Sequence, residues 1–131
     1  MSTESSPLRV LVVDDEPLIC WSLAETLRDR GDIVTEARTV AAAVRALSES
    51  GQPVDVVLLD YQLPDVHNLS MLSTVRRLSP ASRVILMSAY ATPEVAKEAL
   101  ARGASRVIHK PFDMRDVPAM VHDVARPDHN N

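Results

Sequence analysis

Short apolar runs alternate with longer amphipathic segments along the whole chain. Five runs have the length and composition of strands: Val10–Val13, Ile33–Ala37, Val54–Leu59, Val84–Met87 and Arg106–His109. Taken together, these runs are too apolar to lie half exposed to water. Strands of that kind occur in parallel sheets that helices cover on both faces. The pattern therefore predicts a parallel sheet at the centre of the protein.

The segments between the runs show the spacing of helices. They cover residues 18–30, 40–50, 69–78, 93–102 and 114–125. Gly31 and Gly103 follow two of these segments, as glycines that end helices do. Thr92 stands where an N-cap is expected, with Pro93 at the first helical position. The first helix is expected to bury one stripe of residues: Leu18, Ile19, Leu23 and Leu27.

Five strand–helix units in succession predict an α/β fold. We expect a single doubly wound (βα)5 domain, with a five-stranded parallel sheet of order 2-1-3-4-5 and helices on both faces. The domain is expected to cover residues 8–125. Residues 1–7 are expected to be a disordered N-terminus, and residues 126–131 a flexible tail.

Composition and charge narrow the class of protein. The chain has 131 residues, of which 46% are hydrophobic, and a formal net charge of −4. This acidic balance argues against direct binding to nucleic acid. Cys20 is the single cysteine, which excludes an intrachain disulfide and a cysteine metal cage. The apolar runs are too short to span a bilayer and the first residues do not resemble a secretory signal, so we expect a cytoplasmic protein without membrane insertion.

Reactive side chains follow four of the five runs. They are Asp14 and Asp15 after the first run, Asp60 after the third, Ser88 after the fourth and Lys110 after the fifth. The carboxyl ends of the strands form the edge where open α/β sheets bind ligands. Each residue also has a plain structural explanation, as a helix cap, a loop residue or a solvated lysine. Their common position in the expected sheet favours a shared site.

In the expected strand order the first and third strands are neighbours, which crowds Asp14, Asp15 and Asp60 together. Uncompensated carboxylates at short range repel one another. Mg2+ resolves this repulsion, since it binds one or two carboxylates together with waters and phosphate. One carboxylate can then attack phosphorus and form an aspartyl phosphate. Lys110 would add a positive charge, and Ser88 a hydrogen bond.

Four motifs stand in order along the chain: VLVVDDEP (10–17), VVLLDYQLPD (56–65), VILMSAYA (84–91) and GASRVIHKPFD (103–113). Together they resemble the response-regulator receiver domain of two-component signalling. The resemblance covers nearly the whole chain, from about Leu8 to Ala125. The ending HKPFD and the helix sequence ICWSL are similar to receivers of nitrogen-regulation-type transcription factors.

The resemblance implies a phosphoacceptor and a metal site. Asp60 would accept a phosphoryl group from a histidine kinase. Asp14, Asp15 and Asp60 would hold Mg2+, and Gln62 would add its backbone carbonyl. The chain would catalyse this transfer to itself and the later hydrolysis.

The resemblance also implies a conformational switch and its partners. Ser88 would be the switch hydroxyl, and Lys110 would pair with the phosphoryl group. A sensor histidine kinase or a histidine phosphotransferase would be the donor. The signal would pass to a downstream protein, a linked output domain or a homodimer partner. The expected surface is formed by the helix at 93–102, the strand at 106–109 and the helix at 114–125.

Two positions depart from the receiver pattern. Val107 stands where receivers usually carry an aromatic residue whose rotamer couples to the switch hydroxyl. Asn68 stands where a glycine is frequent, and asparagine is the residue type after glycine that best tolerates a left-handed turn. Gln62 and Tyr90 flank the expected pocket, where such residues influence the lifetime of the phosphoryl group.

Three other functions compete with a phosphorylated receiver. A phosphatase of the haloacid dehalogenase type would carry a DxD pattern after the first strand, where this chain has Asp14-Asp15, and would have a cap domain. A flavodoxin-like nucleotide or flavin module would have a glycine-rich phosphate loop, whereas this chain has three glycines in all. A receiver-like protein-interaction module that works without phosphorylation is the main alternative, and Val107 keeps it open.

Overall fold

The sheet has the predicted order. A computed structural model describes residues 7–49, 51–62 and 69–126 of the chain. Its strands are β1 (Arg9–Val13), β2 (Ile33–Ala37), β3 (Val56–Asp60), β4 (Arg83–Ser88) and β5 (Arg106–His109). They form one sheet of order β2-β1-β3-β4-β5 in which every neighbouring pair is parallel. The predicted doubly wound α/β fold is confirmed.

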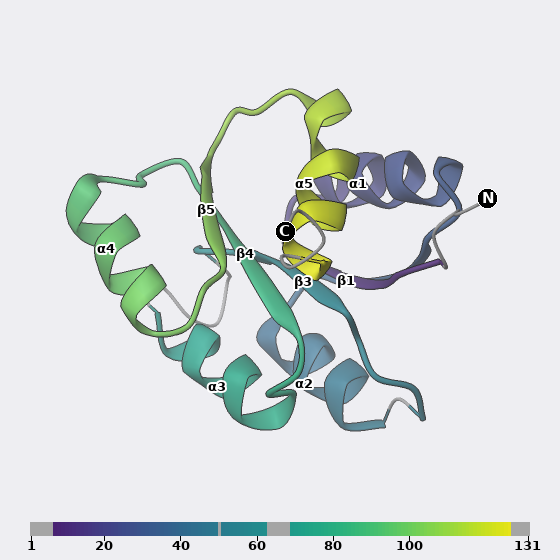
Figure 1. Cartoon of the computed structure of the whole chain (residues 1–131), viewed down its shortest axis with the longest axis horizontal. Coiled ribbons are helices and arrows are strands. Elements are labelled where there is room, and N and C mark those ends of the chain that lie inside the picture. Colours follow the sequence, from purple (N-terminus) through teal and green to yellow (C-terminus); the bar gives the residue numbers. More distant parts are fainter. Residues whose placement is uncertain (1–6, 50, 63–68, 127–131) are drawn as a thin grey trace.

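Helices cover both faces of this sheet. They are α1 (Pro17–Asp29), α2 (Val40–Glu49), α3 (Ser70–Leu78), α4 (Pro93–Ala101) and α5 (Val117–Ala125). Helices α1 and α5 lie on one face, while α2, α3 and α4 lie on the other (Figure 1). Among the described residues, no helix combines the length and the apolar character that a bilayer crossing requires.

Strand β3 joins the two halves of the core. All five of its residues are buried, because alternate side chains point to opposite faces and each face is covered. Leu58 packs with Leu23 of α1 and Val121 of α5. Leu59 belongs to the other cluster, with Leu72 of α3. The continuous apolar run in the sequence therefore reflects burial from both sides.

Helix α1 faces the core with most of the predicted stripe, since Leu23 and Leu27 are buried and Ile19 packs against the core. Its buried residues are Cys20, Leu23, Ala24 and Leu27. Leu18 is 72% exposed, so its predicted place in the core is wrong. At 3.6 residues per turn, Leu18 points roughly 200° away from Cys20. Burial raises the pKa of the Cys20 thiol to about 11, as expected of a core residue rather than a reactive thiol.

Local hydrogen bonds explain where several elements begin and end. Gly31 and Gly103 have φ of +94° and +109°, a left-handed conformation that favours glycine after a helix. The Thr92 hydroxyl accepts a hydrogen bond of 3.2 Å from the Val95 amide, which confirms the predicted N-cap of α4. The helix predicted over 114–125 begins instead as a 3-10 turn at Met114–Asp116.

A buried carboxylate secures the edge of the sheet formed by the strands' amino ends. Asp32 precedes β2, and its Oδ1 accepts a hydrogen bond of 3.1 Å from the Leu8 amide. Its Oδ2 lies 3.3 Å from Nε2 of His122 in α5. These contacts fasten α5 and the start of β1 to the turn before β2.

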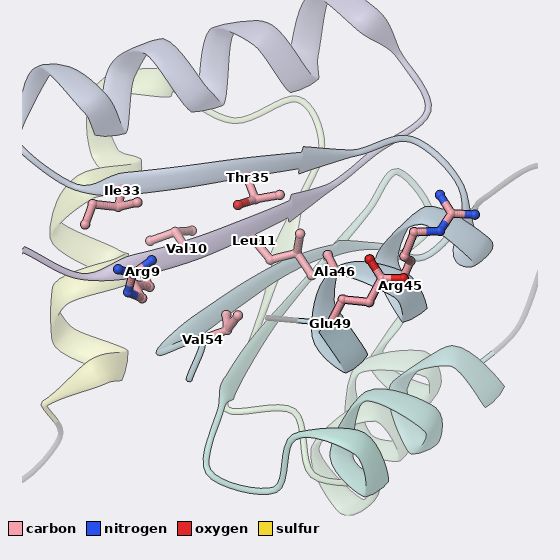
Figure 2. A pocket seen from close by; sticks show the side chains of 9 residues that line it. All are labelled: Arg9, Val10, Leu11, Ile33, Thr35, Arg45, Ala46, Glu49 and Val54. Carbon is pink, nitrogen blue, oxygen red and sulfur yellow. The ribbon is translucent and has the colours of Figure 1, made fainter. Parts of the chain in front are cut away.

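A groove of about 290 Å3 opens at the same edge (Figure 2). Its apolar lining residues are Val10, Leu11, Ile33, Ala46 and Val54, and its charged ones are Arg9, Arg45 and Glu49. Ile33 is 46% exposed there. The groove lies at the start of β1 and β2, the opposite edge from the expected site.

Some expectations concern residues outside the described part of the chain. They are the disorder predicted for 1–7 and 126–131, of which only residues 7 and 126 are described, and the turn at Asn68. The domain bounds of 8–125 likewise stay a prediction.

The two leucines of α1 give a test of this packing. We expect Leu23→Ala to lower the free energy of unfolding by about 2–5 kcal/mol, because a fully buried leucine is removed. Leu18→Ala, in the same helix, should change it by no more than about 0.5 kcal/mol. Urea unfolding followed by circular dichroism measures both. Equal losses in the two variants would contradict the orientation of α1.

Candidate functional site

Three carboxylates meet where β1 and β3 end. Val13 of β1 pairs with Leu59 of β3, so the residues that follow lie side by side. Ligand oxygens of Asp14, Asp15 and Asp60 all lie within 4.8 Å of one another. Asp14 and Asp60 are 0% and 5% exposed, whereas Asp15 is open to solvent. The structure thus brings together the three acidic residues that the sequence predicted.

Lys110 reaches this cluster from the end of β5. Its Nζ lies 2.9 Å from Asp14 Oδ2 and 3.3 Å from Asp60 Oδ2. The backbone helps to hold it, since the Lys110 amide donates a 2.8 Å hydrogen bond to the Ser88 carbonyl. The Lys110–Pro111 peptide bond is cis. An ammonium group is therefore directed at two buried carboxylates, which a solvated surface lysine would not be.

Burial and like charge dominate the electrostatics of Asp60. Burial and the neighbouring Asp14 charge raise the pKa of Asp60 to about 6, although Lys110 and the Gln62 amide act in the opposite direction. Burial also disfavours the Lys110 ammonium, but the hydrogen bond to Asp14 and the charges of Asp14 and Asp60 outweigh it and raise the Lys110 pKa. One lysine leaves the crowded carboxylates only partly compensated.

The donor set fits a hard divalent cation. Carboxylate oxygens are the ligands of Mg2+ and Ca2+, and the exposed Asp15 leaves a path for waters and a ligand. A cavity of about 340 Å3 borders the cluster and is lined by Asp15, Glu16, Asp60, Gln62, Ala89, Tyr90 and Lys110. The Gln62 amide donates a 3.2 Å hydrogen bond to Asp60 Oδ1, which fixes Gln62 beside the cluster.

Ser88 ends β4 at the same edge of the sheet and is 1% exposed. Its Oγ accepts a 2.9 Å hydrogen bond from the Tyr90 amide. Ser88 is not among the residues that line the 340 Å3 cavity. Because the Ser88 oxygen only accepts in this hydrogen bond, its hydroxyl proton stays available to a second partner.

Val107 and Tyr90 occupy different environments. Val107 is partly buried and packs with the core under α2, α3 and α4. Tyr90 is 62% exposed and lines the cavity. Neither side chain therefore supplies a buried aromatic ring on β5 that could follow the Ser88 hydroxyl.

Glu16 is a site residue that sequence reasoning missed. Its Oε1 lies 3.3 Å from Lys110 Nζ, yet in the sequence it reads only as an acidic residue at a helix start. The DDE triplet marks it as charged, but its partner is 94 positions away. Only the fold brings the two together.

Comparisons with known proteins agree with this geometry. The family model for the response regulator receiver domain matches residues 10–122. The chain is similar to the transcriptional regulatory protein KdpE of Mycobacterium tuberculosis, with 39% identity over 117 residues that cover 89% of this chain and 50% of KdpE. It is also similar to the DNA-binding transcriptional regulator NtrC of Proteus hauseri, with 33% identity over 112 residues that cover 86% of this chain and 23% of NtrC.

A solved structure gives the same picture of the fold. The crystal structure of a CheY-like response regulator receiver domain protein from Methanospirillum hungatei is similar to this chain, with a TM-score of 0.86 and 26% identity. The match covers 95% of this chain and 98% of that one. By contrast, the chain spans half or less of the KdpE and NtrC sequences. The nitrogen-regulation type stays a prediction, since relatives named KdpE and NtrC both match.

The raised Asp60 pKa predicts how stability depends on pH in the ion-free protein. Between its ordinary value of 3.8 and about 6, the folded protein keeps a proton that the unfolded chain has released. Ionising Asp60 therefore costs stability as the pH rises through about 6. In chelator, Asp60→Asn should melt at a higher temperature than the wild type at about pH 7.5, with a smaller difference at about pH 5.

Thermal melts followed by circular dichroism measure this effect. Glu49→Gln, at an exposed position of α2, controls for the loss of one negative charge. A lower melting temperature for Asp60→Asn at the higher pH, or a difference independent of pH, would contradict the description of Asp60.

Proposed function

Since the chain belongs to the response-regulator receiver family of two-component signalling, we propose that it is a working phosphoacceptor. In this proposal a sensor histidine kinase or a histidine phosphotransferase donates a phosphoryl group to Asp60. Asp14, Asp15 and Asp60 hold Mg2+, and Gln62 adds its backbone carbonyl. The observation that supports this most strongly is the cluster of three carboxylates with Lys110 Nζ at 2.9 and 3.3 Å from two of them.

The transfer requires an ionised Asp60. A carboxylate oxygen of Asp60 forms a bond to phosphorus, while the phosphorus–nitrogen bond of a phosphohistidine donor breaks and its electron pair stays on the imidazole. Bound Mg2+ supplies positive charge that keeps the carboxylate ionised and offsets the charge of the phosphoryl oxygens. Hydrolysis later returns Asp60 and inorganic phosphate, with water as the nucleophile.

Lys110 and Ser88 recognise the phosphoryl group in this proposal. Lys110 gives up one of its carboxylate contacts for a phosphoryl oxygen, with which it makes a charge-assisted hydrogen bond in a largely buried setting. Ser88 turns from the Tyr90 amide and donates its hydroxyl proton to another phosphoryl oxygen. The Tyr90 amide then loses its hydrogen-bond acceptor at 2.9 Å. Because an unpaired amide is costly, the loop before α4 would rearrange to give it a new acceptor. Phosphorylation would thus shift the population of an alternative conformation.

The output surface is proposed on α4, β5 and α5. Leu100 is 51% exposed there. Arg102, the residue after α4, pairs with Glu98 of that helix at 2.8 Å. A downstream protein, a linked output domain or a second copy of the chain are the proposed partners, in a cytoplasmic setting and without direct contact to nucleic acid. The relatives named as transcriptional regulators are matched over half their length or less, so transcriptional output is a property of those proteins.

A phosphorylation-independent interaction module is the second candidate. The observation that favours it is Val107, which leaves β5 without the usual aromatic residue. Such a module would keep the fold and the surface but would not take up a phosphoryl group on Asp60.

A mass measurement separates the two functions. The protein is incubated with Mg2+ and acetyl phosphate, and we expect a base-labile phosphoryl adduct. Chelator should abolish the adduct because the clustered carboxylates then repel the incoming phosphate. Asp60→Asn should lack it because the attacking oxygen is gone. Intact-mass spectrometry measures the fraction of protein that carries the adduct, in wild type and in Asp60→Asn, each with and without chelator.

Two outcomes would contradict the proposal. An adduct that persists in Asp60→Asn would place the phosphoryl group elsewhere. No adduct from acetyl phosphate or from a cognate kinase, with Mg2+ shown to bind, would favour the interaction module.

A further inference from the structure

Lys110 contacts a third carboxylate that belongs to neither the metal ligands nor the phosphoacceptor. Glu16 Oε1 lies 3.3 Å from Lys110 Nζ, the same distance as Asp60 Oδ2. With Asp14 at 2.9 Å, three carboxylates surround one ammonium group. A lysine has three N–H donors, so in this state each can be directed to one carboxylate.

The three carboxylates differ in their burial and in the backbone hydrogen bonds that hold them. Asp14 is held by the Glu16 amide, which donates a 2.9 Å hydrogen bond to its Oδ1. Asp60 is held by the Gln62 amide. The Glu16 side chain is 57% exposed, whereas those of Asp14 and Asp60 are 0% and 6% exposed. The Glu16 contact is therefore the one that can be released without leaving a buried charge behind.

The Glu16 carboxylate does not cap its own helix. Glu16 is the N-cap of α1, but its side chain makes no capping hydrogen bond. An acidic residue at the N-terminus of a helix is normally explained by its favourable interaction with the helix dipole. Here the carboxylate turns across to Lys110 instead.

We propose that Glu16 is a positioning residue that restrains Lys110 in the unphosphorylated protein and must release it when Asp60 carries a phosphoryl group. This inference rests on the proposed function and deepens it. The Glu16 carboxylate and the phosphoryl oxygens compete for the same ammonium group. Glu16 thereby lowers the affinity of the site for a phosphoryl group and sets how much of the protein is in the active state.

Beryllofluoride is a non-covalent mimic of the phosphoryl group. Its binding equilibrium therefore measures how strongly Glu16 competes for Lys110. Its dissociation constant is measured by 19F NMR titration at saturating Mg2+. We expect Glu16→Gln to bind it about two- to fivefold more tightly than the wild type, the factor that a partly exposed ion pair represents. Glu25→Gln is the matched control, because Glu25 lies on α1, is 51% exposed and pairs with Arg28 at 3.5 Å. It should bind as the wild type does.

A shorter acid separates restraint of Lys110 from simple charge repulsion. Glu16→Asp keeps the negative charge but loses one methylene of reach, so it should behave like Glu16→Gln. Wild-type affinity in Glu16→Asp would overturn the restraint and leave only the charge. Unchanged or weaker binding in Glu16→Gln would overturn the proposal as a whole. No binding by wild type, Glu25→Gln and Glu16→Gln alike would overturn the proposed function, and this inference with it.

Discussion

The crowding of carboxylates at one edge of the sheet is the constraint on which the rest of this site depends. Asp14 and Asp60 are buried side by side because β1 and β3 are neighbours and end at the same level. Buried like charges are costly unless cations or protons compensate them. Lys110 provides one cation, yet burial and the Asp14 charge still raise the pKa of Asp60 to about 6. This partial compensation supports the proposal that the site takes a divalent ion and a group that gives Lys110 a new partner.

The fold makes this crowding possible. Strand β3 is buried on both faces, so the residue at its end cannot move away from Asp14 without disturbing two cores. Lys110 lies in the turn after β5, the edge strand that is two strands away from β3 in the sheet. The packed interior therefore fixes the acids, while the side chains that we propose to move stand at element ends: Ser88, Glu16 and Lys110.

Much of this arrangement follows from the sequence. The strand order and the meeting of Asp14, Asp15 and Asp60 were predictable, because apolar runs end at the same edge of a parallel sheet. The exposed Leu18 was not, because Leu18 and Ile19 are adjacent in the helix and the pattern does not show which of the two faces the core. The contact of Glu16 with Lys110 was not predictable either. It depends on the path of the chain after β5, which no local pattern specifies.

Proton release on Mg2+ binding tests the central claim most directly. Isothermal titration calorimetry of the ion-free protein at about pH 6, in two buffers of different ionisation enthalpy, counts the protons released. We expect roughly half a proton per Mg2+, because Asp60 is about half protonated there and must ionise to bind the ion. Asp60→Asn should release none. Absence of Mg2+ binding, or equal proton release by wild type and Asp60→Asn, would contradict the account.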